Sequence, residues 1–266
     1  MSTLTISDGS GQIIIRQSAI SNFMRISRLF IDAPLKTGQE VLLDKEQLNY
    51  VSRVLRLKPG MQVTVFNGQG GEYSGTITQL HKRSGAIEIA AFHDVDIESP
   101  LNITLVQGIS RGERMDYTLQ KATELGVTRI APVFCGRTVV SLKGERLDSR
   151  LHHWRGVIRS ACEQSGRNRL PQLLVPCSLE VWLANDDAEQ RLLLHPGSDR
   201  SLRDNAQAVT TSLLIGPEGG LTEAEREHAM RSGYMVCRLG PRILRTETAA
   251  LAALACLQLM RGDLNA

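Results

Sequence analysis

From Leu101 onward, short apolar runs alternate with segments of helical periodicity, and this alternation constrains the fold more than any other feature of the sequence. Alternating strands and helices are typical of a parallel sheet covered by helices, so we expect an α/β domain. The predicted strands are 103–107, 127–134, 192–195, 212–216 and 235–239. Four helices are predicted. The first begins at a capping box over 110–113 and ends at Gly126, and the second spans 148–165. The third runs from the capping box over 222–225 to Gly233, and the fourth spans 246–261.

Residues 24–92 follow a different pattern, with short strands separated by glycine turns. Strands are predicted at 40–43, 62–66, 73–80 and 86–92, and Asp44 is predicted to cap a short helix that runs to Leu55. Short strands at regular spacing favour a small β-barrel. The acidic stretch 93–100, which ends in a proline, is predicted to link this barrel to the domain over 101–266. Residues 1–23 do not match a secretory signal and are predicted to be a loose, disordered and dispensable N-terminal extension.

The composition is that of an ordinary globular protein. Of 266 residues, 42% are hydrophobic and 22% are charged, which excludes disorder over most of the chain. The longest apolar run, 249–257, is far shorter than the roughly 18 residues of a membrane span, so no membrane contact is expected. The five cysteines show no C-x-x-C spacing, so we expect neither a metal site nor disulfides, and the cysteines are interpreted as core residues in a reducing compartment.

The net charge of +3 hides a local concentration of basic side chains. Between Arg137 and Arg169 there are eight Lys or Arg residues and three acids. A concentrated basic face is typical of contact with a phosphate backbone. A solvated helix face explains the same charges, so the charge pattern by itself leaves both interpretations open.

Two apolar strands each run directly into a Gly-Pro loop and then into a helix. The first loop is Gly216-Pro217-Glu218-Gly219-Gly220, and the second is 239–249, in which Arg245, Thr246 and Glu247 stand at the helix entrance. Ligands of open α/β sheets bind at the carboxyl ends of the strands, and glycines let the backbone approach them closely. The first loop has neither dinucleotide nor P-loop spacing. A tight turn, and simple capping by Thr246 or Thr248, are the alternatives.

A third motif, over 161–171, ends the basic helix with Cys162-Glu163-Gln164-Ser165-Gly166-Arg167-Asn168-Arg169. Dense polar groups in a turn suit the recognition of a phosphate or a base edge. The alternative is a helix C-terminus with Gly166 at the position that follows the last helical residue.

Taken together and in this order, the motifs resemble those of SPOUT-class RNA methyltransferases, specifically the bacterial small-subunit ribosomal RNA uridine-N3 methyltransferase family (RsmE). The resemblance covers nearly everything from Met24 to the C-terminus, whereas residues 1–23 depart from the family pattern. It is carried by 24–28 (Met-Arg-Ile-Ser-Arg), 110–115 (Ser-Arg-Gly-Glu-Arg-Met), 120–126, 162–169 and the two Gly-Pro loops.

The resemblance implies a PUA-like β-barrel followed by a SPOUT α/β domain with a C-terminal trefoil knot. It implies a cytoplasmic homodimer that binds S-adenosylmethionine and methylates N3 of uridine 1498 in the 16S ribosomal RNA of the small subunit. The chemistry requires a slot for the cofactor, stabilisation of charge on the uracil oxygens, and a group that accepts the N3 proton.

Each motif residue is assigned to one of these tasks. Cofactor binding is expected of Leu194, His195, Ile215, Gly216, Pro217, Glu218, Gly219, Gly220, Leu239, Gly240, Ile243, Leu244 and Thr246. Catalysis is expected of Arg167, Asn168 and Arg245, which would orient the uracil and stabilise its charge. Glu163 or Glu247 is expected to accept the N3 proton as the general base. RNA binding is expected of Arg25, Arg28, Arg111, Arg137, Arg155, Arg159 and Arg169.

Two alternatives stay open at this point. Another SPOUT activity, such as ribose 2′-O methylation or methylation of a transfer RNA, would use the same cofactor loops. A non-catalytic RNA-binding or ribosome-assembly factor with a relic pocket is the second. The polar set Arg245-Thr246-Glu247 argues against a relic, and S-adenosylmethionine binding would discriminate the two classes.

Overall fold

The computed structural model describes residues 26–140, 142–205 and 209–264. The predicted extension 1–23, and Arg25, lie outside the described residues. No helix in the described ranges is both long and apolar enough to cross a membrane.

The first part of the chain forms a five-stranded sheet. Its strands are β1 (Ser27–Phe30), β2 (Glu40–Leu42), β3 (Gln62–Phe66), β4 (Glu72–Leu80) and β5 (Gly85–His93), in the order β1-β3-β4-β5-β2. β1 runs parallel to β3, and the other neighbours are antiparallel. Alternate residues such as Val63 and Val65, or Ile87 and Ile89, are buried in one core, as the alternation in the sequence predicts. The sequence reading missed β1.

A short helix covers this core. α1 (Lys45–Asn49) begins at Asp44, whose side chain accepts from the backbone N–H of Gln47 while the Gln47 side chain accepts from the Asp44 N–H. The predicted cap is confirmed. The helix continues as a wider π-helical turn, η1 (Tyr50–Val54), and Leu48 and Val51 bury its inner side.

The second part of the chain is built on the predicted parallel sheet. Neighbouring strands follow the order β12-β10-β11-β6-β7-β8, and every pair is parallel. A short strand, β9 (Cys177–Ser178), also pairs with β7. The strand bounds are β6 (Asn102–Gly108), β7 (Arg129–Phe134), β8 (Gln172–Leu173), β10 (Gln190–Leu194), β11 (Thr210–Ile215) and β12 (Met235–Cys237).

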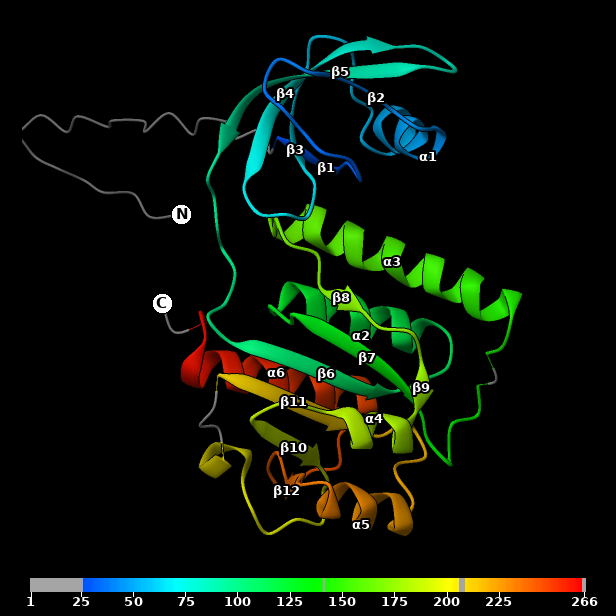
Figure 1. The fold of residues 1–266 in the computed structure, drawn as a ribbon, viewed down its shortest axis with the longest axis vertical. Coiled ribbons are helices and arrows are strands. Elements are labelled where there is room, and N and C mark those ends of the chain that lie inside the picture. Colours follow the sequence, from blue (N-terminus) through cyan, green and yellow to red (C-terminus); the bar gives the residue numbers. More distant parts are fainter. Residues whose placement is uncertain (1–25, 141, 206–208, 265–266) are drawn as a thin grey trace, which may run out of the picture.

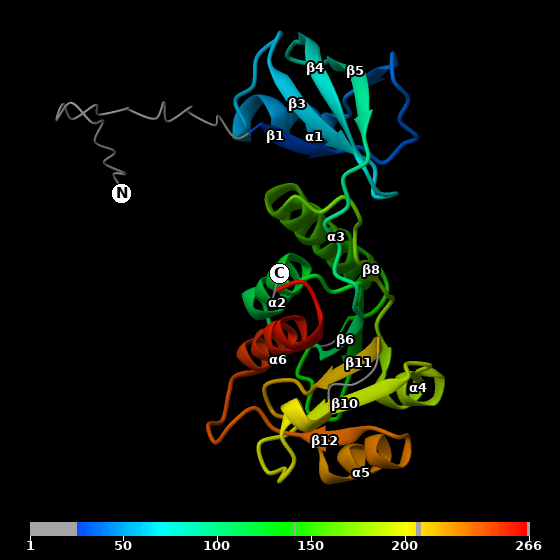
Figure 2. The same ribbon diagram turned by 90° about the vertical axis from the view of Figure 1, so that its left-hand side faces the viewer.

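Helices cover both faces of this sheet (Figures 1 and 2). α2 (Glu113–Glu124), α3 (Glu145–Ser165) and α6 (Thr246–Arg261) lie on one side, and α4 (Leu179–Asn185) and α5 (Glu223–Arg231) lie on the other. A short 3₁₀ turn, η2 (Leu202–Asn205), lies between β10 and β11. Successive residues of a strand serve opposite cores: Leu105 packs with the α2 and α6 side chains, and Val106 with those of α4. Two buried faces explain why these strands read as continuous apolar runs.

Some of the helix ends predicted from capping residues are confirmed, and others are wrong. The capping box of Thr222 and Glu225 is confirmed at α5, and Gly166 ends α3 with φ +89°. The capping box predicted at Ser110 is wrong, because α2 begins after Gly112 and Ser110 is buried beside the Gly108 carbonyl. α3 begins at Glu145, three residues before the predicted start. The sequence reading missed α4, although its cap, Ser178, is a standard signal.

The two parts meet at α3, which packs against β1 and lies directly below the N-terminal sheet in Figure 1. The segment between β5 and β6 runs down one side of the molecule and connects them. α3 is therefore shared between the parallel sheet, which it covers, and the N-terminal sheet, which rests on it.

Candidate functional site

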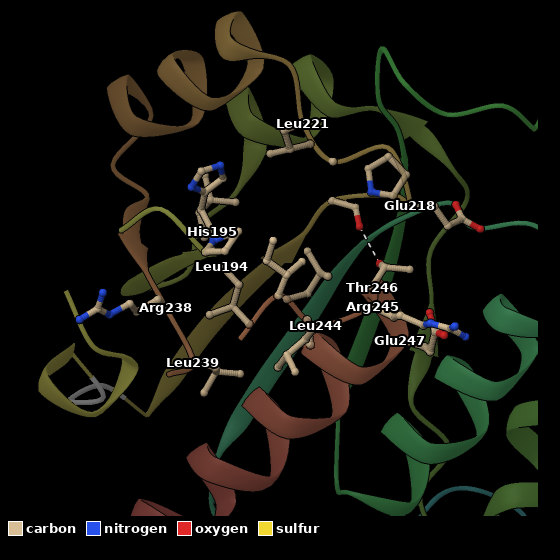
Figure 3. A pocket seen from close by; sticks show the side chains of 18 of the residues that line it. Leu194, His195, Glu218, Leu221, Arg238, Leu239, Leu244, Arg245, Thr246 and Glu247 are labelled. Atoms are coloured by element: carbon tan, nitrogen blue, oxygen red, sulfur yellow. Dashed lines mark hydrogen bonds between the residues drawn. The ribbon is translucent and has the colours of Figure 1, made fainter. Parts of the chain in front are cut away.

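The carboxyl ends of three adjacent strands, β10, β11 and β12, open into one pocket (Figure 3). Its volume of about 490 Å³ lies within the range of pockets that hold small ligands. Because parallel strands end at the same edge of a sheet, the loops that follow them must face one another. The two Gly-Pro loops are thus two walls of one pocket, and Leu194 and His195 form a third.

Nearly all of the residues predicted to bind a cofactor line this pocket. They are Leu194, His195, Ile215, Gly216, Pro217, Glu218, Gly220, Leu239, Gly240, Ile243, Leu244 and Thr246. Arg245 and Glu247, predicted for catalysis, line it as well. Sequence reasoning missed Arg114, Leu193, Pro196, Leu221, Arg238, Arg242 and Ala249, and assigned Arg137 to RNA instead. Arg114 and Arg242 belong to quoted motifs, so their position in those motifs was the available signal.

Gly219, which was predicted to bind the cofactor, is absent from the lining of the pocket, and its φ is not positive. Its carbonyl accepts from Nη1 of Arg137 at 2.9 Å. The neighbouring Gly220 has φ +69°, as Gly240 has φ +67°, and a Cβ built at either would meet nothing within 4 Å. These two glycines therefore combine a left-handed backbone with open space, which suits a loop that cradles a ligand.

A third glycine allows the strand ends to approach one another. A Cβ at Gly108, the last residue of β6, would lie 2.4 Å from the backbone nitrogen of Pro217. The Gly-Pro loop after β11 therefore rests directly on the end of β6. A larger residue at position 108 would push this wall of the pocket outward.

Thr246 fixes the position of the second loop relative to the first. Its Oγ1 donates to the carbonyl oxygen of Gly216 at 2.6 Å, shown dashed in Figure 3, and accepts from Nε2 of the buried Gln107 at 2.9 Å. The expectation that Thr246 caps α6 is wrong, because Arg245 occupies the cap position without a side-chain cap bond. Thr246 instead joins β6, β11 and α6 beneath the pocket.

Glu218 makes a second connection at the rim. Its Oε1 accepts from the backbone N–H of Arg111 at 3.0 Å and from Nη1 of Arg114 at 3.2 Å. Burial acts to raise the pKa of Glu218, but the hydrogen bonds from Arg111 and from its own backbone, with the nearby Arg114 cation, outweigh it and lower that pKa. The carboxylate therefore stays charged and holds the start of α2 against the Gly-Pro loop.

His195 forms a neutral part of the pocket wall. Its Nε2 lies 2.9 Å from Nη1 of Arg226, and its Nδ1 accepts from the N–H of Gly197 at 3.1 Å. Burial and the Arg226 cation lower the pKa of His195, and Glu223 opposes them. An uncharged imidazole is compatible with a cationic ligand in the pocket.

Glu247 carries an unused acceptor. Its Oε2 is buried, and within the described ranges it has no hydrogen-bond partner. It lies beside Arg245 at the entrance to α6 (Figure 3). A buried carboxylate oxygen without a donor is costly, so such an atom in a pocket is a candidate for contact with a ligand.

The other predicted catalytic residues lie elsewhere. Arg167 is 4% exposed, and its Nε donates to the Glu98 carboxylate at 3.1 Å. Its Nη1 donates to the carbonyl oxygens of Thr123 and Val127 at 2.8 and 2.9 Å. The prediction that Arg167 contacts the target base is corrected, because its guanidinium is already enclosed by a carboxylate and two carbonyls.

Asn168 and Glu163 likewise serve the junction between the two parts of the molecule. Asn168 donates to the Val95 carbonyl at 3.1 Å and accepts from Arg28. Oε1 of Glu163 accepts from the Phe30 N–H at 3.0 Å. Both side chains are buried, and neither lines the pocket. Their predicted catalytic roles are therefore corrected to structural ones, which leaves Glu247 as the candidate base.

The residues predicted to bind RNA divide by exposure. Arg111, Arg137, Arg155 and Arg169 are exposed. Arg28 is corrected: it bonds Glu72 and Asn168 and packs on the Phe66 ring, so its charge is already neutralised. Arg159 is half-buried at the same junction, near Glu46.

Cys135, Cys162 and Cys237 are buried, as the sequence predicts for core residues, whereas Cys177 and Cys256 are only partly buried. Burial raises the pKa of the Cys135, Cys162 and Cys237 thiols to about 12, so they remain protonated. All five cysteines are free. In the part of the chain that the structure describes, no cluster of three or more His, Cys, Asp or Glu is arranged to hold a metal ion.

Comparison with known proteins gives consistent results. Residues 97–258 match the family model of an RNA methyltransferase domain, and residues 43–90 match that of an RNA methyltransferase PUA domain. The chain is 33% identical to the ribosomal RNA small subunit methyltransferase E of Buchnera aphidicola, covering 92% of this chain and 98% of the relative. It is 30% identical to the protein of the same name in Bacillus subtilis, covering 82% and 91%.

Two solved structures share this fold with a bound cofactor. The ribosomal RNA small subunit methyltransferase E of Neisseria gonorrhoeae, bound to S-adenosylmethionine, is 40% identical with a TM-score of 0.84 over 90% of this chain and 99% of its own. A methyltransferase of Legionella pneumophila in complex with the same cofactor is 39% identical with a TM-score of 0.88, over 90% and 100%.

Proposed function

This chain belongs to the family of the ribosomal RNA small subunit methyltransferases E, and from that premise we propose that it methylates N3 of uridine 1498 in 16S ribosomal RNA. The methyl donor is S-adenosylmethionine. The observation that carries this proposal is the pocket where β10, β11 and β12 end, with a Glu247 oxygen at its edge that has no hydrogen-bond partner among the described residues.

The pocket fits the proposed cofactor. Apolar side chains such as Leu194, Leu239 and Leu244 offer surfaces for adenine, and the backbone of the two glycine loops offers hydrogen-bond donors and acceptors. S-adenosylmethionine carries no phosphate, so the lack of a P-loop pattern is consistent with it. When bound, it supplies an electrophilic methyl group. Glu218 lines the rim of the pocket as a carboxylate that is paired with Arg114.

The chain's own residues prepare the uracil for this reaction. N3 of uracil carries a proton and is a poor nucleophile until that proton is removed, so a nearby general base is required. Glu247 lines the pocket and is the candidate general base. Arg245 beside it orients the uracil and offsets the charge that develops on the uracil oxygens. Fixed positioning of N3 in line with the methyl group supplies much of the remaining rate enhancement.

The N-terminal sheet and the exposed arginines are proposed to hold the ribosomal RNA. The PUA domain match supports this for residues 43–90. Arg111, Arg137, Arg155 and Arg169 remain exposed for contact with phosphates. The small ribosomal subunit is the partner, and the cytoplasm, where ribosomes are assembled, is the proposed location.

The proposal includes a C-terminal trefoil knot and a homodimer. Thr246 ties the chain that follows β12 to the loop after β11, which supports a path that passes close beneath that loop. The outer side of α6 keeps apolar residues partly exposed, with Leu259 57% accessible, which supports a second copy on that helix. Both features are what the resemblance to the family implies.

The other activities are less well supported. Ribose 2′-O methylation or methylation of a transfer RNA would not explain relatives named for the small ribosomal subunit that align over most of both chains. A non-catalytic assembly factor would not need an intact pocket with a buried carboxylate oxygen that the described part of the chain leaves without a hydrogen-bond partner.

The test is methyl transfer to small ribosomal subunits from a strain that lacks this gene, with modified uridines mapped by mass spectrometry. We expect one methylated base, on N3 of uridine 1498. Glu247→Gln should abolish most transfer at neutral pH while the cofactor still binds, and Glu227→Gln on the exposed side of α5 should not. Modification of a ribose or of another nucleotide would contradict the proposal.

A further inference from the structure

The cofactor pocket has a neighbour. A second hollow of about 610 Å³ lies against α2 and the start of α6. Its lining includes Glu113, Asp116, Tyr117 and Gln120 of α2. It shares Arg114, Arg245 and Glu247 with the cofactor pocket. A methyl donor in one hollow and an acceptor base in the other would meet at these three side chains.

Arg114 is held at this boundary by a carboxylate. Its Nη1 donates to Glu218, which in turn is anchored by the backbone N–H of Arg111. The Arg114 side chain nevertheless stays 49% exposed, so part of its guanidinium is open to a ligand. A cation that is positioned before the substrate arrives needs little reorganisation during the reaction.

The α2 side of the second hollow suits a base better than a phosphate. Glu113 and Asp116 line it and would repel a phosphodiester, whereas Tyr117, 50% exposed, offers an aromatic face. Stacking on an aromatic side chain is a common way to hold an unpaired base. The hollow is therefore consistent with a base extruded from the RNA.

We propose that Arg114 is a catalytic residue that contacts a carbonyl oxygen next to N3 of the target uracil, and that Glu218 is the positioning residue that aims it. The inference rests on the proposed function. As N3 loses its proton to Glu247, negative charge spreads to the flanking oxygens, where the guanidinium meets it. The N3 lone pair then forms the bond to the methyl group, and the electrons of the broken methyl–sulfur bond stay with sulfur.

Single-turnover rates at saturating RNA and cofactor test this role. Arg114→Ala should lower the rate by about 10²–10³-fold, the usual effect of removing one donor to a developing oxyanion. Its affinity for S-adenosylmethionine, measured by calorimetry, should be nearly unchanged. Arg114→Lys should restore part of the rate, and Arg231→Ala on the exposed face of α5 should match the wild type.

A change of substrate separates charge stabilisation from a structural effect. Small subunits are reconstituted with 5-fluorouridine at the target position, where fluorine makes N3 more acidic. The loss caused by Arg114→Ala should shrink on this substrate, and its pH–rate profile on uridine should shift to higher pH. Glu218→Gln should lower the rate less, and should add no further loss in the Arg114→Ala background.

The outcomes distinguish the two proposals. An equal loss on uridine and on 5-fluorouridine, or a loss of cofactor or RNA affinity with the saturated rate intact, would overturn the role of Arg114 alone. A wild-type protein that transfers no methyl group to uridine N3 would instead overturn the proposed function, and this inference with it.

Discussion

One positive φ angle distinguishes two adjacent glycines of the loop after β11. Gly220 has φ +69° and open space at its Cβ position, whereas Gly219 lacks the positive φ and lies against Arg137. The sequence does not indicate which of the two glycines has the positive φ, because they are adjacent and follow the same Gly-Pro-Glu. A side chain at position 220 would strain the backbone, whereas one at position 219 would crowd Arg137, whose Cβ would lie 3.0 Å from the added Cβ.

We predict that Gly220→Val weakens S-adenosylmethionine binding by about 10-fold, equivalent to roughly 1.4 kcal/mol, because a β-branched residue resists a left-handed backbone and shifts the loop. The measurement is calorimetric titration of the cofactor. Gly38→Val is the matched control, since Gly38 has φ +79° and open space but lies before β2, in the N-terminal sheet. Equal affinities for both variants would show that the loop tolerates a side chain at 220.

The element that joins the two parts of the molecule, α3, has one glycine inside it and one directly after it, and the two have opposite roles. Gly166 ends the helix with φ +89°, and a Cβ there would lie 3.4 Å from Cδ1 of Ile97. Gly156 lies inside the helix, has no positive φ, and has nothing within 4 Å of its Cβ position. The same residue type therefore stabilises the end of α3 and weakens its middle.

We expect Gly166→Ala to destabilise the protein by about 1–2 kcal/mol, the cost of a left-handed L residue. Gly156→Ala should stabilise it by roughly 0.5–1 kcal/mol, because alanine loses less backbone entropy in a helix. Urea unfolding of the two variants gives both values. If Gly156→Ala were less stable than the wild type, an added methyl group would disturb the hollow between α3 and the N-terminal sheet, which Gly156 lines.

At the scale of the whole molecule, buried polar residues hold the N-terminal sheet on the methyltransferase domain. Burial raises the pKa of Glu163 above its ordinary 4.5, although the Phe30 N–H, Tyr50 and the Arg159 and Arg28 cations oppose that shift. Above pH 4.5 the unfolded chain releases this proton before the folded protein does. Glu163 therefore makes the folded state less stable as pH rises from 4.5 through its higher folded value.

We predict that Glu163→Gln becomes more stable relative to the wild type as pH rises from about 4.5 to 8, because glutamine keeps an acceptor for Phe30 without a buried charge. Urea unfolding at the two pH values measures the change. Glu189→Gln, at an exposed position before β10, should show no such trend. A Glu163→Gln variant that is less stable by the same amount at both pH values would contradict the prediction.

The sequence determined most of the elements, which depend on local signals, and the place of the pocket, which depends on the order of strands and loops. The α6 bounds, the capping box at Thr222 and the parallel strands follow from residues a few positions apart. The Gly-Pro loops had to meet because parallel strands end at one edge of a sheet. Twelve of the thirteen predicted cofactor residues line the pocket for that reason.

The tertiary structure decided which polar residues serve the site and which serve the junction between the domains. Arg167 looks equally suited to a base or to a carboxylate, and its carboxylate partner, Glu98, lies 69 positions away in the linker. Glu163 and Asn168 are likewise used by β1 and the linker. The partner of a charged side chain cannot be identified from the sequence, because Coulombic attraction depends on distance in space and not on separation along the chain.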